Sequence, residues 1–310
     1  MFIMLMNIVL LIVGFVFLTY GADMFIDGAS ALARRFHIPE IVIGLTVVAF
    51  GTSLSEASVS IASVLHGANG VAVGNILGSN IANIFLVLGI TAIITTLTIQ
   101  KNTVRYEIPF VGFITVLLMW MGATYGMISR VGAGVLIALL FAFVLYLVFC
   151  ARKEIEPEQN IPNMSGWKMI VFLIVGIAAV IFSSNLIVDS SVNIARALNI
   201  SERVIGLTII AFGTSLPELV TCIVAAIKKR SDLAVGNIIG SNIVNILFVL
   251  GITGLIKPIP FEPAFLIDGA IGVIAIVMLW LFAYRCYKLT RASGVVSLLS
   301  YFVYLAYLFM

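Results

Sequence analysis

Residues 206–218 read GLTIIAFGTSLPE, and this stretch puts a carboxylate and two helix-weakening residues inside an apolar run. Gly213 adds backbone freedom, and Pro217 has no N–H to donate. A helix break inside hydrocarbon leaves carbonyls without partners, which is tolerated only where they line a cavity or face other protein. Such carbonyls, the hydroxyls of Thr214 and Ser215 and the carboxylate of Glu218 are hard oxygen donors that suit Na⁺ or Ca²⁺.

The same pattern occurs earlier in the chain, where residues 44–56 read GLTVVAFGTSLSE. A second element also repeats, because residues 74–83 read GNILGSNIAN and residues 236–245 read GNIIGSNIVN. Both elements are offset by 162 residues (218 − 56 and 245 − 83), with no gap between them. The sequence therefore contains an internal duplication, as expected of a transporter core.

The composition indicates a membrane protein. The 310-residue chain is 62% hydrophobic and only 10% charged, far outside the range of soluble proteins. A net charge of +3 over such a chain gives no signal for nucleic-acid binding. Cys150, Cys222 and Cys286 have no metal-like or disulfide-like spacing, so we interpret them as apolar or interfacial residues. The first apolar run is longer than a signal peptide and is interpreted as the first helix.

Charge and glycine divide the chain into ten apolar segments, each long enough for a spanning helix of about 20 residues. With five segments per copy, the second copy enters the membrane from the opposite side, as in the inverted repeats of secondary transporters. We predict an all-α polytopic membrane protein of two inverted five-helix repeats, residues 1–150 and 167–310, joined by a cytoplasmic connector at 151–166. Helices 2 and 7 are predicted to be broken. The predicted spans are 5–34, 41–65, 70–97, 104–124, 130–150, 167–197, 203–227, 233–256, 264–285 and 292–310.

The basic residues orient this arrangement. With the N-terminus outside, thirteen of the 17 Lys and Arg residues fall on the inner side, a strong positive-inside bias. Both termini are therefore expected outside a plasma membrane.

Glu56 and Glu218 are expected near the bilayer midplane, where a charge costs about 2.5–3.5 kcal/mol. Two carboxylates there repel each other, and a bound cation is the simplest compensation. We expect the first half-helices to end at Ala49 and Ala211 with free carbonyls that attract a cation. The alternative is a capping box, because Ser53-x-x-Glu56 and Ser215-x-x-Glu218 both fit that pattern.

The second repeated element contributes serines and asparagines. Ser79 with Asn83, and Ser241 with Asn245, are i, i+4 pairs that share one face of a helix. That face can point at the glutamate of the preceding helix, so these residues are candidate ion ligands. The alternative is helix packing through small and amide side chains. The remaining asparagines of this element are predicted to make interhelical hydrogen bonds: Asn75, Asn80, Asn237 and Asn242.

Other polar residues are given lesser roles. Asp23, Asp27 and Asp189 lie toward the ends of long helices and are interpreted mainly as solvated or mouth-lining acids. His37 and His66 are interpreted as surface histidines. No hydrolase site built on histidine is supported, so no enzymatic activity is predicted.

These motifs resemble those of the sodium/calcium exchangers of the cation/calcium antiporter superfamily, and the chain is similar to a prokaryotic-type member. The two copies look like its alpha-repeats, over about residues 39–97 and 201–256. The resemblance implies the ten-helix fold and a sliding gate formed by the first and sixth helices. It implies no cofactor and no obligatory protein partner. It also implies these ion ligands: Glu56, Glu218, Thr52, Ser53, Thr214, Ser215, Ser79, Ser241, Asn83, Asn245, and the carbonyls of Ala49 and Ala211.

Two residues depart from the family pattern. Ser55 stands where the family usually has proline, so the break in the second helix is expected to depend on Gly51 and to be less rigid. Asn245 stands where some potassium-dependent members have Asp, which argues against K⁺ transport.

The resemblance implies exchange of three Na⁺ for one Ca²⁺ by alternating access, which is electrogenic. The nearest alternative is a proton/calcium exchanger, in which the glutamates carry protons. A passive cation channel and a membrane scaffold are less favoured alternatives. A Ca²⁺ flux that depends on a Na⁺ gradient would indicate the sodium/calcium exchanger, and one that depends on a pH gradient would indicate the proton/calcium exchanger.

Overall fold

The computed structural model describes residues 2–66, 69–151, 164–198 and 211–308. Within these ranges eight helices are long and apolar enough to cross a membrane, and a bent pair, Glu40–Thr52 with Leu54–Leu65, makes a ninth. Leu216–Ile227 is a shorter apolar helix, and the segment predicted to complete its span lies outside the described residues. The protein is thus an all-helical polytopic membrane protein, and the count of ten spans stays a prediction.

The first half of the chain contains a long helix, a broken helix, a central helix and two further spans. Their bounds are α1 (Phe2–Phe36), α2 (Glu40–Ile43), η1 (Gly44–Val48), α3 (Ala49–Thr52), α4 (Leu54–Leu65), α5 (Asn69–Ala82), η2 (Asn83–Val87), α6 (Leu88–Ile94), β1 (Leu97–Thr98), η3 (Thr103–Glu107), α7 (Ile108–Tyr125), β2 (Met127–Ile128) and α8 (Arg130–Ala151). The segments labelled η are π-helical turns that continue the flanking α-helices.

The second half repeats this order of elements. Their bounds are α9 (Gly166–Ala197), α11 (Ala211–Thr214), α12 (Leu216–Ile227), α13 (Ser231–Val244), η5 (Asn245–Leu250), α14 (Gly251–Ile256), β3 (Ile259–Pro260), α15 (Ala264–Cys286), β4 (Lys288–Leu289) and α16 (Arg291–Leu308). The predicted spans agree with these helices to within a few residues wherever the structure describes them. The first half of the predicted seventh span, 203–210, lies outside the described residues.

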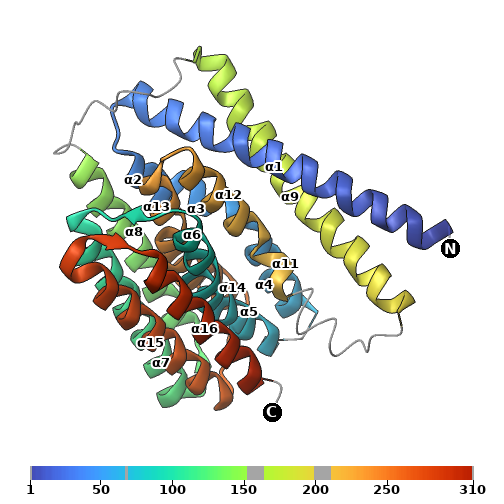
Figure 1. The fold of residues 1–310 in the computed structure, drawn as a ribbon. Helices are drawn as coiled ribbons and strands as arrows, with labels where there is room; N and C mark the ends of the chain where they lie inside the picture. Colours follow the sequence, from blue (N-terminus) through green and yellow to red (C-terminus); the bar gives the residue numbers. More distant parts are fainter. Residues whose placement is uncertain (1, 67–68, 152–163, 199–210, 309–310) are drawn as a thin grey trace.

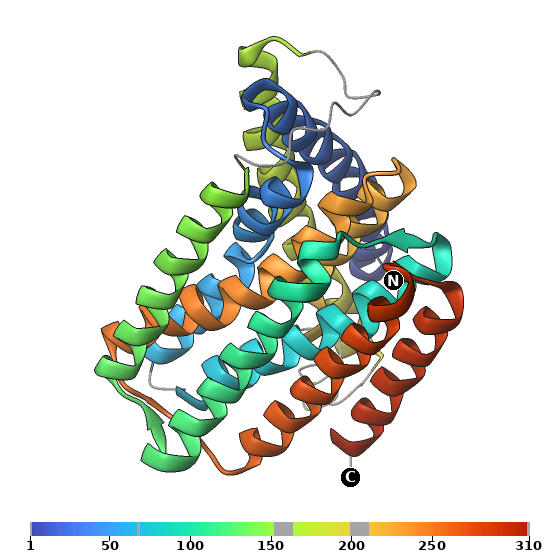
Figure 2. The ribbon, with the colours of Figure 1, turned by 90° about the vertical axis from the view of Figure 1, so that its left-hand side faces the viewer.

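The helices form three groups (Figure 1). The long helices α1 and α9 pack along each other and lie obliquely across one side of the molecule. The central spans that contain α5 and α13 are mostly buried, whereas the other spans expose most of their residues, as expected of helices in contact with lipid. Figure 2 shows α7, α8, α15 and α16 on the far side of this centre from α1 and α9.

Two short antiparallel ladders join the halves at the ends of the helices. β1 pairs with β4, with Leu97 opposite Leu289, and β2 pairs with β3, with Ile128 opposite Ile259. The offset of the duplication relates these ladders to each other, because β1 corresponds to β3 (259 − 97 = 162) and β2 to β4 (289 − 127 = 162). Each ladder therefore combines one strand from each copy.

Candidate ion-binding site

The two copies break their helices at the same serine. Helix α3 ends at Thr52, and Ser53 (φ −73°, ψ 5°) separates it from α4, with a bend of 45°. In the second copy, Ser215 (φ −90°, ψ 3°) separates α11 from α12. The nearly equal dihedral angles show that the break forms without a proline in the first copy. Pro217 therefore is not needed to create this backbone geometry.

The expected end of the first half-helix at Ala49 is wrong. The carbonyl of Ala49 accepts the backbone N–H of Ser53 at 3.0 Å, so it is not free. The helix continues through Gly51 because glycine adopts helical dihedrals, and its missing Cβ permits a break without forcing one. In the second copy the carbonyl of Phe212 accepts the N–H of Ser215 at 3.2 Å.

Glu56 and Glu218 are the two acidic residues at the breaks. Both are fully buried in the first turns of α4 and α12, where a helix N-terminus favours negative charge. They lie close enough to repel each other electrostatically. Within the described part of the chain, Oε1 of Glu56 and Oε2 of Glu218 have no hydrogen-bond partner.

The capping-box alternative does not fit this geometry. Neither Ser53 nor Ser215 makes a side-chain hydrogen bond to the helix that it precedes. The hydroxyl of Ser53 lies instead 3.5 Å from Oε1 of Glu218 in the other copy. Ser53 is therefore directed toward the other copy, and neither serine caps the helix that follows it.

Ser55 contacts the Glu56 carboxylate, and the sequence did not indicate this contact. Its hydroxyl lies 3.0 Å from the carbonyl of Thr52 and 3.3 Å from Oε2 of Glu56. The corresponding residue, Pro217, has no hydroxyl (217 − 55 = 162). The difference between Ser55 and Pro217, in two otherwise similar copies, was the one feature of the sequence that could have indicated this contact.

Hydroxyl and amide groups of the central helix α13 extend the site. Thr52 donates to Oδ1 of Asn237 at 3.0 Å, and its oxygen lies 3.3 Å from the hydroxyl of Ser241. The amide of Asn237 donates to the Thr221 hydroxyl at 2.9 Å. In the first copy, Ser79 on α5 faces the Glu56 carboxylate. All of these groups are buried.

Four asparagines connect α5 and α13 at the centre of the molecule. The backbone carbonyl of Asn242 accepts the Asn80 amide at 3.2 Å, and the carbonyl of Asn80 accepts the Asn242 amide at 3.3 Å. Asn83 donates to Oδ1 of Asn242, and Asn245 donates to Oδ1 of Asn80, both at 3.0 Å. The predicted interhelical hydrogen bonds of Asn80 and Asn242 are confirmed. Oδ1 of Asn83 and Oδ1 of Asn245 are buried and have no partner among the residues that the structure describes.

Two carboxylates and several hydroxyls thus lie at the break region, and the amides of Asn83 and Asn245 lie on η2 and η5, which pack against α12 and α4. The buried oxygens of these groups that have no partner among the described residues are Glu56 Oε1, Glu218 Oε2, Asn83 Oδ1, Asn245 Oδ1 and Ser215 Oγ. A buried polar atom without a partner is costly and points to an absent ligand. Oxygen atoms with two negative charges suit a hard cation such as Na⁺ or Ca²⁺. Thr214 is half-buried beside them on α11.

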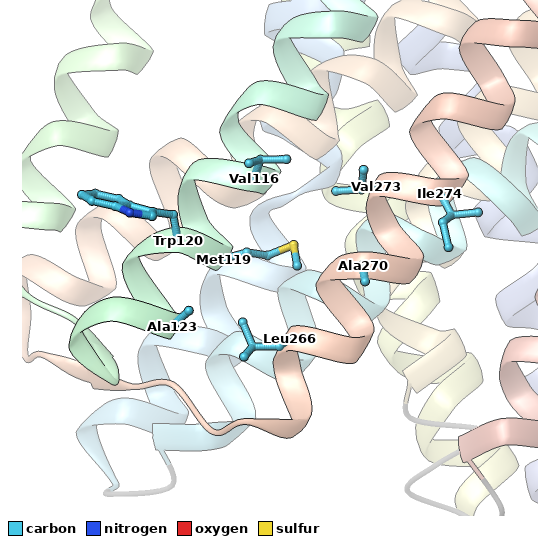
Figure 3. Close-up of a pocket in the computed structure, with 8 residues that line it drawn as sticks. All are labelled: Val116, Met119, Trp120, Ala123, Leu266, Ala270, Val273 and Ile274. Atoms are coloured by element: carbon cyan, nitrogen blue, oxygen red, sulfur yellow. The ribbon is translucent and has the colours of Figure 1, made fainter.

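Two other features are not candidate cation sites. The groove between α7 and α15 (Figure 3) is lined by eight apolar side chains, including Met119, Trp120 and Leu266, and it has no oxygen ligand to offer. Among the described residues no cluster of three or more His, Cys, Asp and Glu side chains exists. The break region is therefore the place where hard oxygen donors converge.

Comparison with known proteins agrees with this chemistry. The family model described as "Sodium/calcium exchanger protein" matches residues 6–151 and 168–310. The chain belongs to the sodium/calcium exchanger family. It is therefore a cation/Ca²⁺ antiporter and not an enzyme.

Individual proteins that this chain is similar to align along nearly its whole length. The putative antiporter CaxA of Alkalimonas amylolytica is 37% identical over 98% of both chains. The inner membrane protein YrbG of Escherichia coli is 38% identical over 99% of this chain and 98% of YrbG. A structure of the sodium-calcium exchanger NCX_Mj, soaked with 2.5 mM Na⁺ and 0.1 mM Ca²⁺, superimposes with a TM-score of 0.86 at 34% identity and covers 97% of this chain and 98% of NCX_Mj.

Proposed function

We propose that the protein exchanges Na⁺ for Ca²⁺ by alternating access, that the exchange is electrogenic, and that it needs no K⁺. The observation that carries this proposal is a set of five buried oxygens without a partner among the described residues, three at the two helix breaks and two on the turns η2 and η5, which pack against α12 and α4. Two carboxylates neutralise one Ca²⁺ or two Na⁺, and both ions compete for the same oxygens. Their occupancies then exclude each other, which couples the two fluxes.

The charge count supports an electrogenic cycle. A third Na⁺, bound by hydroxyl and carbonyl oxygens, leaves the loaded site with one net positive charge. Moving that charge across the membrane corresponds to about 2.3 kcal/mol per 100 mV. The neutral Asn245 in place of an acidic residue keeps the site at two formal charges, which supports K⁺ independence.

The proposed ligands are the two glutamates, the hydroxyls beside the breaks and the groups of α5 and α13 that face them. The carbonyl of Ala49 accepts the N–H of Ser53 and lies 3.4 Å from the Thr52 hydroxyl, and we keep it among the proposed ligands because a carbonyl oxygen has two lone pairs and Thr52 donates its proton to Asn237. The full set is Glu56, Glu218, Thr52, Ser53, Thr214, Ser215, Ser79, Ser241, Asn83, Asn245, Ala49 and Ala211. The bilayer, Na⁺ and Ca²⁺ are the proposed partners.

We further propose that the two halves are inverted repeats in the plasma membrane, with both termini outside. The two β-ladders each pair a strand of one copy with a strand of the other, and the offset of 162 relates one ladder to the other, which supports the duplication. The bias of basic residues supports the orientation. Single cysteines at the exposed positions Lys229 and Lys257 test it, because only the first should be labelled from the cytoplasmic side.

The deciding experiment measures ⁴⁵Ca²⁺ uptake into proteoliposomes loaded with Na⁺, with and without an outward Na⁺ gradient at matched pH. Uptake that requires the Na⁺ gradient, and that responds to a valinomycin-set membrane potential, is the expected result. Liposomes without protein and a Glu56→Gln variant are the controls. Uptake that ignores Na⁺ would overturn the proposed coupling.

A Ca²⁺/H⁺ exchanger is the second candidate. The observation in its favour is that both carboxylates keep one unpartnered oxygen, which a proton can occupy as readily as a metal ion. Uptake driven by a pH gradient alone, with choline replacing Na⁺, would select this candidate. Uptake without any counter-ion would instead indicate a channel.

A further inference from the structure

A group of charged residues outside the ion-binding site connects α1 to the end of α12. Lys228, the residue after α12, places its ammonium 2.6 Å from the carboxylate of Asp27 and 2.8 Å from that of Asp23. The same nitrogen donates to the backbone carbonyl of Asp23 at 3.3 Å. The side chains of Asp27 and Lys228 are each 25% exposed, so their ion pair is partly shielded from water. One lysine therefore holds the broken helix against the long helix that crosses it.

The duplication gives each of these residues a counterpart in the other half. The offset of 162 relates Asp27 to Asp189 on α9 (189 − 27), and it relates Lys228 to His66, which follows α4 (228 − 66). Because the copies are proposed to cross the membrane in opposite directions, the counterparts lie at the opposite membrane face.

The two ends of the molecule are not packed alike. Helix α1 packs along α12, whereas the equivalent helices α9 and α4 make no comparable contact in their described parts. Asp189 is exposed, and neither it nor His66 forms an ion pair with any residue that the structure describes. The ion pair is thus made in one copy and not in the other.

From this asymmetry we infer that Asp23, Asp27 and Lys228 form a cytoplasmic latch, which holds the inner side closed in the state described here. His66 and Asp189 form the equivalent outer latch when the transporter faces inward. The inference rests on the proposed function, because inverted repeats exchange their conformations during alternating access. A contact that one copy makes in one state then belongs to the other copy in the opposite state.

The two latches differ in strength. In the cytoplasmic latch the ammonium of Lys228 contacts two carboxylates, whereas the residue at the equivalent position of the outer latch is an imidazole, that of His66. The cytoplasmic latch also has a second carboxylate, Asp23, whose counterpart is the neutral Asn185 (185 − 23 = 162). The stronger cytoplasmic latch therefore favours the outward-facing state at rest, and His66 becomes a residue that sets the resting equilibrium.

The test measures the distance between spin labels at Phe36, on α1, and Ile227, on α12, in ion-free nanodiscs. Both labelled positions are well exposed. Cys150 and Cys286 are replaced by serine, and Cys222 is left in place because it is buried. The unlatched variants Lys228→Met and Asp27→Asn are expected to add a longer-distance population. The double variant Asp27→Lys with Lys228→Asp, which exchanges the two charges, should again lack the longer-distance population.

Lys229→Met is the matched control, because it removes the same charge at the next residue. His66→Lys tests the outer latch without disturbing the existing ion pair, and it should also add the longer distance. Asp189→Asn should reverse the effect of His66→Lys. A Lys228→Met variant that behaves like Lys229→Met, or a His66→Lys variant with unchanged distances, would overturn the inference.

A flux measurement separates this inference from the proposed function. In right-side-out vesicles, half-saturation by external Ca²⁺ should rise about two- to fivefold in Lys228→Met and His66→Lys, because partly exposed pairs are weak and only the outward-facing fraction binds external ions. Absence of Na⁺-dependent Ca²⁺ flux in the wild type would contradict the proposed function. The distances would still decide whether the latch exists.

Discussion

Asn242 accepts a hydrogen bond from the side-chain amide of Asn83 at 3.0 Å. This bond uses an N–H of Asn83 and leaves its Oδ1 buried, with no partner in the described ranges of the chain. Replacing a group that orients a metal ligand through a hydrogen bond typically lowers metal affinity by about 10- to 100-fold. Asn242 therefore positions a proposed ion ligand without being one.

Replacing Asn242 by alanine should lower Ca²⁺ affinity by about 10- to 100-fold, because Asn83 loses the partner that fixes its amide. Isothermal titration calorimetry on purified protein measures this affinity. Asn193→Ala is the control, since Asn193 bonds Asn7 at 3.4 Å in the α1–α9 pair and not at the site. Equal affinities of the two variants would contradict the positioning role.

Glu56→Gln and Glu218→Gln should each abolish Ca²⁺ transport, because one carboxylate cannot neutralise a divalent ion. In ion-free buffer both variants should unfold at a higher temperature than the wild type, since the repulsion between the buried charges is gone. Both should also lose the Ca²⁺-dependent stabilisation, which is about 2.7 kcal/mol for a site at 100 times its Kd. Thermal unfolding followed by tryptophan fluorescence measures these effects, with the exposed Glu262→Gln as control. Near-normal flux in either glutamine variant would contradict this assignment.

Ser55→Ala and Ser55→Pro should both fold and transport, because Ser53 breaks the helix with the same dihedrals as Ser215. Both should raise half-saturation by Ca²⁺ about fivefold, the equivalent of one hydrogen bond of about 1 kcal/mol to Glu56. Flux titrations measure it, and Ser58→Ala is the control because its hydroxyl bonds only the Leu54 carbonyl. Wild-type half-saturation in Ser55→Ala would exclude a role for the hydroxyl.

Gly213→Ala should slow turnover about tenfold while Ca²⁺ binding persists. A Cβ at Gly213 would overlap the Val188 side chain on α9, and such overpacking costs about 1–3 kcal/mol. Comparing initial Ca²⁺ flux with equilibrium binding separates movement from affinity. Gly134→Ala is the control, because a Cβ there meets open space. If the two variants turn over equally, α9 does not need this close approach.

The sequence predicted the spans well because hydropathy and length are properties of each segment alone. The span predicted at 104–124 is found at Thr103–Tyr125, and the one predicted at 264–285 is Ala264–Cys286. The prediction that the first half-helix ends at Ala49 was wrong, because Gly51 adopts a helical conformation and the helix continues to Thr52. Residue propensities alone could not decide whether the helix ends before Gly51 or continues through it.

Contacts between distant parts of the chain could not be predicted from the sequence. Lys228 and Asp27 are separated by 201 residues, so their approach depends on how α1 crosses α12. The sequence therefore indicates only a solvated or mouth-lining acid at Asp27, and the structure adds its ion pair with Lys228. The asparagines were predicted to bond between helices, but which carbonyl each one meets depends on the packing of α5 against α13.

The reciprocal bonds between Asn80 and Asn242 also constrain how the protein is made. Asn242 leaves the ribosome 162 residues after Asn80, which at 5–20 residues per second is on the order of 10–30 s. The side chain of Asn80 bonds to Asn242 and Asn245 of the second copy, so these hydrogen bonds form only after that interval. The first copy of the repeat is therefore an incomplete product until the second is synthesised, and the duplicated halves mature as a single unit.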